Sequence, residues 1–492
     1  MESLRVDLLP YQKEAVNWCY EKESKCCILA YEMGLGKTVI TTAVIAQKPL
    51  KTLVMVPASL LNQWNSELNK FIKNANTFIY HGNNKSKRRI ENADIILSTP
   101  AIIANEMRNS TYSRKFKGIK RWVIDEAHKL RNMKSKTYKG LKLQSTTIQN
   151  KIFLTGTPIC NTSSDLISLI CLSNYEVYND MHMWKNMTDS IRYKQLESII
   201  PDVLLRRTKI DTISCMLPDI SIQMIELNVE TDIQKSTYNH FIEREDEILK
   251  KILRTRQSLN NAKQLIDDLD ELEDMKDDDN EQEISVKIKT IKNIISNIPS
   301  NDKILIFSFF TKCLRSIYNI LDIPLNTERD VYIKLYTGDT PIAERAEIIE
   351  EFRKNQNTRI MLMNLRTGGV GLNLVEANHV ILVEPYWNDA EEQQAINRVY
   401  RLGQIKQVYV YKLYVKNTIE KWLLSLQKNK KNIASYFIDK LKNKPIAEDL
   451  ISQRECVRNL FRQIKYICLP DSTEEIKEVE ALLQEFEIPD LV

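Results

Sequence analysis

The sequence predicts an α/β protein with two parallel-sheet units, helical insertions and a C-terminal helical extension. Three observations support this fold class. Short apolar runs alternate with helix-like segments near the N-terminus, the alternation then breaks, and it resumes in the second half. Alternation of this kind indicates a parallel sheet with helices on both faces. The length of 492 residues also exceeds what one ordinary core occupies.

Buried strands are expected wherever a short apolar run is bounded by polar sequence. In the first half these runs are 25–30, 52–56, 94–99, 121–125 and 151–155. In the second half they are 303–309, 331–336, 360–364, 379–383 and 408–414. The interval 163–291 has mostly helical periodicity, and the chain after 416 is helical and charged.

These patterns predict four segments. They are a first lobe over 1–210 that is helical from about 163, a helical insertion and linker over 211–295, a second lobe over 296–425, and a helical extension over 426–492. The acidic run 267–283 in the linker is interpreted as a solvated segment, with a partner-binding or autoinhibitory role as the alternative.

Composition limits the class of partner. Lys and Arg number 70 against 65 Asp and Glu, so any phosphate-binding surface must be local. The 9 cysteines form no C-x-x-C pair, which argues against zinc and against a disulfide scaffold. No apolar run is long enough to cross a membrane, so we expect a soluble, intracellular protein.

The first motif is a phosphate-binding loop that follows the run 25–30 and opens a helix. It consists of Met33, Gly34, Leu35, Gly36, Lys37 and Thr38. Backbone N–H groups at a helix N-terminus bind phosphate, Lys37 would reach the β- and γ-phosphates, and Thr38 would ligate Mg²⁺. Tyr31 stands where the strict pattern has a further glycine, and the motif alone is also compatible with a glycine turn.

Two further motifs follow predicted strands. Asp125 and Glu126 come directly after the run at 121–125, and we expect Asp125 to hold Mg²⁺ and Glu126 to act as the general base on water. Thr155 and Thr157 flank a glycine at the next strand end, where they could link site closure to domain movement; T-G-T-P is also a good turn.

The second half carries two more motifs, 366–374 (RTGGVGLNL) and 393–404 (QQAINRVYRLGQ). Arg398 and Arg401 are three positions apart, which predicts one helix face. Two arginines outside the phosphate loop's domain suit contacts to the γ-phosphate, although a basic surface helix has the same pattern.

The ordered set of motifs resembles the Swi/Snf family of DNA-dependent ATPases in helicase superfamily two, including reduced viral members such as global transactivators. The set also includes LLPYQ at 8–12, VMVPASLLNQW at 54–64, IILSTP at 95–100 and LLRRTK at 204–209. The resemblance covers roughly 8–415. The segment 204–209 and the R-x-x-R-x-G-Q ending separate this family from RNA helicases.

The resemblance implies two RecA-like lobes that bind ATP and double-stranded DNA and move along the duplex without melting it. It assigns adenine recognition to Gln12, a further ATP contact to Gly369, and the hydrolytic roles to the residues named above. It implies DNA-backbone contacts from Ser59, Ser98, Thr99 and Thr367. It assigns coupling to His128, Thr155, Thr157 and Gln394.

The chain departs from the family pattern at a few positions. Tyr31 replaces the usual Asp, Asn364 replaces Ser or Thr, and Glu384 and Asp389 flank a segment where Asp and Pro are common. None of these removes a hydrolytic residue, but Tyr31 and Asn364 put the hydrolysis rate and its coupling to DNA in doubt.

Three functions remain open from the sequence. They are a double-stranded DNA translocase that acts on DNA-bound proteins, a strand-separating DNA or RNA helicase, and a non-catalytic transcription scaffold. We expect ATP and Mg²⁺ as cofactors, no zinc, and a location in the nucleus, the host nucleus if the chain is viral. A monomer suffices for this architecture. The basic cluster 85–89 is a solvated loop beside the sheet or a nuclear localisation signal, and 428–431 has the same ambiguity.

Overall fold

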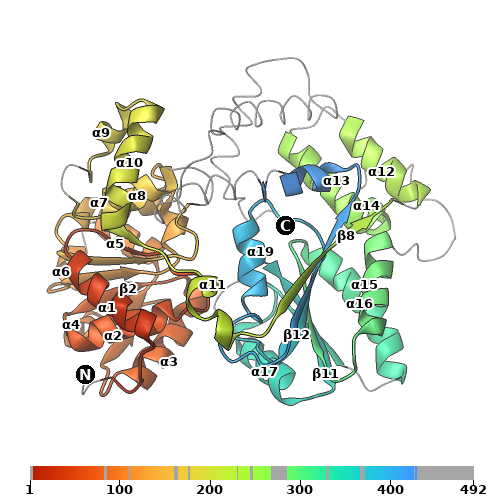
Figure 1. Cartoon of the computed structure of the whole chain (residues 1–492), viewed down its shortest axis with the longest axis horizontal. Helices are drawn as coiled ribbons and strands as arrows, with labels where there is room; N and C mark the ends of the chain where they lie inside the picture. The colour runs from red at the N-terminus through yellow and green to blue at the C-terminus, as the bar shows by residue number, and fades with distance from the viewer. Residues whose placement is uncertain are drawn as a thin grey trace. The chain divides into compact units, whose positions relative to one another are not determined.

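The computed structural model describes residues 4–82, 86–109, 112–159, 164–175, 178–229, 231–243, 248–267, 285–328, 332–365, 372–425 and 427–428. The chain divides after Met216 into two compact units (Figure 1), here called unit 1 and unit 2. Within the described ranges, none of the helices combines the length and the apolar character that a bilayer span requires.

Unit 1 contains a seven-stranded parallel sheet in the order β3-β4-β2-β5-β6-β1-β7. Its strands are β1 (Cys27–Leu29), β2 (Thr52–Met55), β3 (Thr77–Ile79), β4 (Ile95–Ser98), β5 (Arg121–Ile124), β6 (Asn150–Leu154) and β7 (Leu204–Leu205). Its helices are α1 (Pro10–Lys22), α2 (Lys37–Gln47), α3 (Leu61–Phe71), α4 (Lys87–Asn92), α5 (Pro100–Arg108), α6 (Tyr112–Lys115), α7 (Lys136–Ser145), α8 (Ser164–Leu172), α9 (Met181–Lys185), α10 (Asp189–Val203) and α11 (Lys209–Thr212).

Unit 2 contains a six-stranded parallel sheet in the order β10-β11-β9-β12-β13-β8. Its strands are β8 (Ile220–Leu227), β9 (Lys303–Ser308), β10 (Tyr332–Tyr336), β11 (Thr358–Asn364), β12 (Ala377–Leu382) and β13 (Val408–Val415). Its helices are α12 (Asp232–Glu243), α13 (Ile248–Asn260), α14 (Ala262–Asp267), α15 (Val286–Asn297), α16 (Thr311–Glu328), α17 (Ile342–Lys354) and α19 (Asp389–Ile396).

Helices cover both faces of the unit 2 sheet, as the predicted alternation requires. On one face, Ile291 of α15 and Leu314 of α16 pack against Ile306 of β9. On the other face, Phe352 of α17 and Ile396 of α19 pack in the cluster that contains neighbouring strand residues. The predicted fold class, two α/β units with parallel sheets, is confirmed.

The prediction of mostly helix over 163–291 was wrong at two strands. β7 and β8 lie in that interval, and β3 was also missed. β8 is an edge strand with its central residues exposed, so it lacks the continuous apolar run that marked the other strands. β3 and β7 are too short to produce a pattern. The acidic run past Asp267 and most of the predicted extension 426–492, with the basic cluster 428–431, lie outside the described residues.

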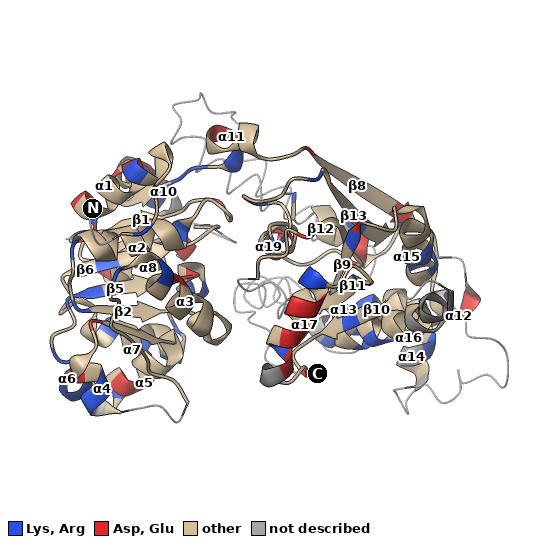
Figure 2. Ribbon diagram, turned by 90° about the horizontal axis from the view of Figure 1, so that it is seen from below, with Lys and Arg blue, Asp and Glu red and all other residues tan. Residues whose placement is uncertain are grey.

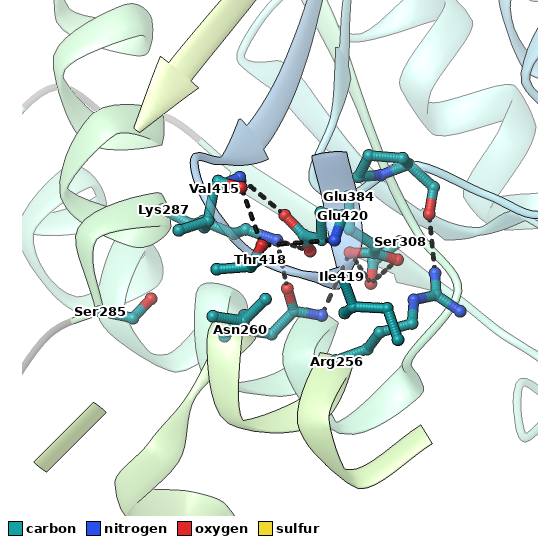
Figure 3. Close-up of polar contacts among 12 residues, drawn as sticks. Arg256, Asn260, Ser285, Lys287, Ser308, Glu384, Val415, Thr418, Ile419 and Glu420 are labelled. Atoms are coloured by element: carbon teal, nitrogen blue, oxygen red, sulfur yellow. Dashed lines mark hydrogen bonds and ion pairs between the residues drawn. The ribbon is translucent and has the colours of Figure 1, made fainter. Parts of the chain in front are cut away.

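A buried charge network ties the helices α13 and α15 to the sheet of unit 2 (Figure 3). The Lys287 ammonium lies 2.5 Å from a carboxylate oxygen of Glu420, and neither side chain is exposed. Lys287 also donates to Oδ1 of Asn260 at 2.8 Å. The Nδ2 group of Asn260 donates to Glu384 at 3.2 Å. The network therefore joins two insertion helices to the segments that follow β12 and β13.

Glu384, one of the departures from the family pattern, is the second carboxylate of this network. It accepts hydrogen bonds from the Ser308 hydroxyl at 3.0 Å and the Phe309 N–H at 2.6 Å. Burial raises the pKa of Glu384, and the positive charges of Lys287 and Arg256 oppose that shift. Two cations and two carboxylates thus balance one another inside unit 2.

We predict that Glu420→Ala destabilises unit 2 by about 3–5 kcal/mol, because it leaves the Lys287 ammonium buried without its counter-charge. Urea denaturation measures the free energy of unfolding. The matched control is Glu350→Ala, which breaks an exposed pair with Lys354 and should have little effect. The double change Lys287→Met with Glu420→Leu should recover much of the loss. Equal losses of unfolding free energy in Glu420→Ala and Glu350→Ala would contradict a buried ion pair.

Candidate nucleotide-binding site

The loop between β1 and α2 has the backbone geometry of an anion site. Gly34 and Gly36 adopt φ values of 90° and 81°, where only glycine is unstrained. A Cβ atom on Gly36 would lie 2.6 Å from Nε2 of Gln12, so a side chain there would also displace the Gln12 amide. α2 starts at Lys37, and the free N–H groups and dipole of its first turn favour a bound anion.

Lys37 lies among the carbonyl groups at the end of β1. Its ammonium donates to the Tyr31 carbonyl at 2.7 Å and to the Glu32 carbonyl at 3.5 Å. Burial lowers the pKa of Lys37 to about 8, while the carboxylates of Glu126 and Asp125 oppose the shift. Thr38 follows in the first turn of α2 with its side chain half-buried. Met33 and Leu35 complete the loop.

Gln12 contacts the phosphate loop from α1. Its Nε2 group donates to the Leu35 carbonyl at 3.3 Å, and its Oε1 atom accepts the Leu9 N–H at 3.0 Å. Tyr11 donates to the same Leu35 carbonyl at 3.2 Å. The predicted adenine-reading residue is therefore adjacent to the loop that would hold the phosphates.

Asp125 and Glu126 follow β5 with their carboxylates half-buried. Asp125 accepts the Glu126 N–H at 2.8 Å and the indole N–H of Trp64 at 2.9 Å. Burial, and secondly the charge of Glu126, raise the pKa of Asp125 to about 6. Glu126 has φ 48°, a strained value for a residue with a Cβ. Its buried Oε2 atom makes no hydrogen bond among the described residues and lies 3.4 Å from Nδ1 of His128.

The loop after β6 packs against the phosphate loop. A Cβ on Gly156 would lie 3.1 Å from Cγ of Met33 and 3.8 Å from Nζ of Lys37. The Thr155 hydroxyl lies 3.1 Å from Nδ1 of His128 and accepts the Thr157 N–H at 3.1 Å. The structure thus brings all three predicted coupling residues of unit 1 together.

The residues of unit 1 that are predicted to contact DNA differ in how accessible their side chains are. Ser59 is exposed in a 3₁₀ turn over Ala58–Leu60. Ser98 is fully buried and donates its hydroxyl to the Tyr80 carbonyl at 2.8 Å. The Ser98 hydroxyl is therefore already used inside unit 1, and a DNA contact from Ser98 stays a prediction for its main chain. Thr99 caps α5 by accepting the Ile102 N–H at 3.3 Å. Thr367 lies outside the described residues.

The prediction that Arg398 and Arg401 lie on one face of a helix in unit 2 was wrong. α19 ends at Ile396, and both arginines lie in the turns that follow it. The Nη1 group of Arg398 donates to the Leu372 carbonyl at 3.4 Å. Gln394 is buried on α19. Gly369 lies outside the described residues.

Sequence reasoning gave no role to three residues that organise these motifs. Trp64 holds Asp125, as described above. Gln404 donates to the Ala377 carbonyl at 2.7 Å and accepts N–H groups that follow it in the chain. Arg206 donates to the Gly156 carbonyl at 2.6 Å. All three stand in motifs that were recognised as signatures. Their partners Asp125, Ala377 and Gly156 are distant in the sequence, so the motifs alone did not predict these contacts.

A phosphate loop, an adjacent acidic pair and a T-G-T loop at one edge of a parallel sheet define a helicase-like, nucleotide-binding ATP hydrolase. The comparison with protein families agrees: the SNF2-related domain matches residues 11–281, and the helicase conserved C-terminal domain matches residues 286–403. The chain belongs to the SNF2-related family, which confirms the resemblance found in the sequence.

Relatives of this chain include cellular and viral proteins. It is 27% identical to a SWI/SNF-related, matrix-associated, actin-dependent regulator of chromatin (subfamily A containing DEAD/H box 1 homolog) from Caenorhabditis elegans, over 90% of this chain and 52% of that protein. It is 26% identical to a probable global transactivator of Orgyia pseudotsugata multicapsid polyhedrosis virus, over 88% and 92%. This chain therefore spans about half of the nematode relative's length and most of the viral one's.

Among solved structures, the Sulfolobus solfataricus SWI2/SNF2 ATPase core in complex with dsDNA has 29% sequence identity and a TM-score of 0.40 to this chain, with 90% of this chain and 96% of that chain covered.

We predict that His128 makes the stability of unit 1 dependent on pH. Burial, with Lys129 and Arg131 nearby, lowers the pKa of His128 from 6.5 to about 3. The free energy of unfolding of unit 1 is unaffected by His128 above pH 6.5, where the imidazole is neutral in both states. It decreases as pH falls from 6.5 toward 3, because only the unfolded state takes up the proton. The loss approaches about 1.4 kcal/mol per pH unit below 6.5.

The measurement is thermal unfolding from pH 8 to pH 5 for the wild type and His128→Asn. The variant should have the flatter pH profile, whatever its absolute stability. Parallel profiles would show that His128 does not carry this dependence.

Proposed function

We propose that this chain is an ATP-dependent motor on double-stranded DNA that displaces or repositions DNA-bound proteins. The observation that carries the proposal is the assembly of Lys37, Asp125, Glu126 and Thr155 at one edge of the unit 1 sheet. A scaffold would not need these groups, so their presence argues against a non-catalytic role.

The residues of unit 1 fit a magnesium nucleotide. Gly34 and Gly36 adopt positive φ angles, which glycine tolerates and which let the backbone approach phosphates closely. The Thr38 hydroxyl and the Asp125 carboxylate are the oxygen ligands that Mg²⁺ prefers. Bound Mg²⁺ would supply charge neutralisation at the phosphates.

Each side chain then has a separate task in hydrolysis. Lys37 leaves the Tyr31 carbonyl for the phosphates, and Glu126 accepts a proton from the attacking water. The Oε2 atom of Glu126 supports that role, because it makes no hydrogen bond among the described residues and lies 3.4 Å from Nδ1 of His128. Gln12 selects the adenine base. Arg398 and Arg401 are the residues of unit 2 proposed to contact the γ-phosphate, and Gly369 is proposed as a further ATP contact.

Coupling of hydrolysis to movement is proposed for His128, Thr155, Thr157 and Gln394. The His128–Thr155–Thr157 contacts support this assignment, because they connect the segment after Glu126 to the loop after β6. Any change at the acidic pair would therefore reach the T-G-T loop through one side-chain contact.

Double-stranded DNA is the proposed track because one relative is named as a regulator of chromatin and another as a global transactivator. Ser59, Thr99 and Thr367 are the proposed backbone contacts, and Ser98 would contribute through its main chain only. Such contacts position a duplex without reading its sequence. The ribbon in Figure 2 is coloured at Lys and Arg positions in both units, including α4. In α4, Arg88 and Arg89 of the cluster 85–89 are exposed.

A strand-separating helicase is the second candidate, favoured by the match to the helicase C-terminal domain. We also propose a nuclear location, in keeping with the chromatin relative, and activity as a monomer. DNA-bound proteins are the proposed substrates of the motor.

The proposal predicts ATP hydrolysis that double-stranded DNA stimulates more than single-stranded DNA or RNA. Lys37→Ala should lower kcat about 100-fold or more, because the charge at the transferred phosphate is lost. Lys139→Ala on the exposed face of α7 is the control and should match the wild type. Raising the salt concentration should weaken stimulation by DNA through lost phosphate contacts.

A strand-displacement assay separates the candidates. A motor of the proposed kind removes the third strand from a DNA triplex with ATP and leaves the duplex intact. Release of a labelled duplex strand would identify a helicase instead, and no hydrolysis with any nucleic acid would leave only the scaffold.

Trp64→Phe should raise the Mg²⁺ concentration for half-maximal hydrolysis by about tenfold, because Asp125 loses the donor that orients its carboxylate. The matched control is Trp184→Phe, which removes a buried indole hydrogen bond to the Tyr178 carbonyl elsewhere in unit 1. Magnesium titrations of both variants test the role, and identical shifts would assign the effect to lost packing.

A further inference from the structure

Arg206 lies where the last segment of unit 1 runs beside the phosphate loop. β7 pairs in parallel with β1, with Leu205 opposite Leu29. The contact continues past both strands, because the Ala30 N–H donates to the Leu205 carbonyl at 2.8 Å and the Glu32 N–H donates to the Arg207 carbonyl at 3.0 Å. The approach to the phosphate loop is thus attached to the segment that leads out of unit 1 after Met216.

The guanidinium of Arg206 bridges two strand ends. Its Nη1 group donates to the Ala30 carbonyl after β1 at 2.7 Å and to the Gly156 carbonyl after β6 at 2.6 Å. β1 and β6 pair as far as Leu29 and Leu154. Arg206 therefore contacts the segments after β1 and β6 at the point where the two strands separate. The first segment continues into the phosphate loop and the second into the T-G-T loop.

Lys37 lies among the same group of carbonyls. Its ammonium is bonded to the carbonyl of Tyr31, the residue after Ala30. A Cβ on Gly156 would lie 3.8 Å from that ammonium. Without Arg206, the carbonyls of Ala30 and Gly156 would lose their charged donor and could compete with a nucleotide for the Lys37 ammonium.

We infer that Arg206 is a positioning residue of the nucleotide site. It occupies two strand-end carbonyls, fixes the T-G-T loop against the phosphate loop, and leaves Lys37 held by the Tyr31 carbonyl so that phosphates can displace it. The inference rests on the proposed ATP-dependent function. It gives a task to an arginine of the 204–209 segment that the motif alone did not explain.

The test compares Arg206→Gln with Arg206→Lys. Arg206→Gln removes the charge and should raise the KM for ATP about ten- to hundredfold, with a smaller fall in kcat. Arg206→Lys keeps a cation that can reach a carbonyl and should recover most of the affinity. The control is Arg192→Gln in unit 1, because Arg192 also donates to two carbonyls, those of Trp184 and Met187, outside the site. Its KM should equal that of the wild type.

Binding of a fluorescent ATP analogue is measured in parallel, together with the melting temperature. An unchanged KM and analogue affinity in Arg206→Gln would overturn the inference, as would the same loss in Arg192→Gln. If Arg206→Gln does not fold, Arg206→Met, which also lacks the charge, decides, because near-wild-type stability with weakened analogue binding supports positioning and unchanged binding refutes it. If the wild type hydrolyses no ATP, the proposed function fails, and analogue binding still tests Arg206.

Discussion

The parallel pairing of β5, β6, β1 and β7 is the constraint on which the candidate site depends. In a parallel sheet all carboxyl ends lie at one edge, so the segments that follow these strands meet there. Lys37 after β1, Asp125 after β5 and Thr155 after β6 are separated widely in sequence but come together for this reason. The segment after β7 joins them at the same edge. No single motif could build the site without its neighbours in the sheet.

The same edge concentrates charge in a partly dehydrated place. Burial lowers the pKa of Lys37, and the charges of Glu126 and then Asp125 oppose that shift. Burial raises the pKa of Asp125, and the Trp64 hydrogen bond and then the Lys37 charge oppose that shift. His128 stays neutral beside Thr155 and can therefore exchange hydrogen bonds without a change of charge. The strained Glu126 backbone and a buried carboxylate oxygen that makes no hydrogen bond are both costly, which is typical of a site prepared for a ligand.

Much of the fold could be predicted because most strands are continuous apolar runs, which parallel sheets bury on both faces. β8 was missed because it is an edge strand whose central residues, Ile222 to Met224, are exposed. Such a strand does not require a continuous apolar run. The end of α19 at Ile396 was missed because three-residue spacing fits a turn as well as a helix. Ser98 shows the limit of a motif, since its hydroxyl is used by the Tyr80 carbonyl. Contacts through space, such as Trp64 to Asp125, leave no local pattern.

The departures from the family pattern replace contacts and do not simply remove them. Tyr31 is buried and donates its hydroxyl to the Tyr11 carbonyl at 3.1 Å, so the phosphate loop stays connected to the helix that carries Gln12. Asn364 donates to the Phe309 carbonyl at 2.8 Å, next to the N–H that Glu384 accepts. Each substitution changes the chemistry of a supporting contact while the hydrolytic groups stay in place. We therefore expect these departures to affect how firmly the loops are held, because none of them lies at a proposed hydrolytic residue.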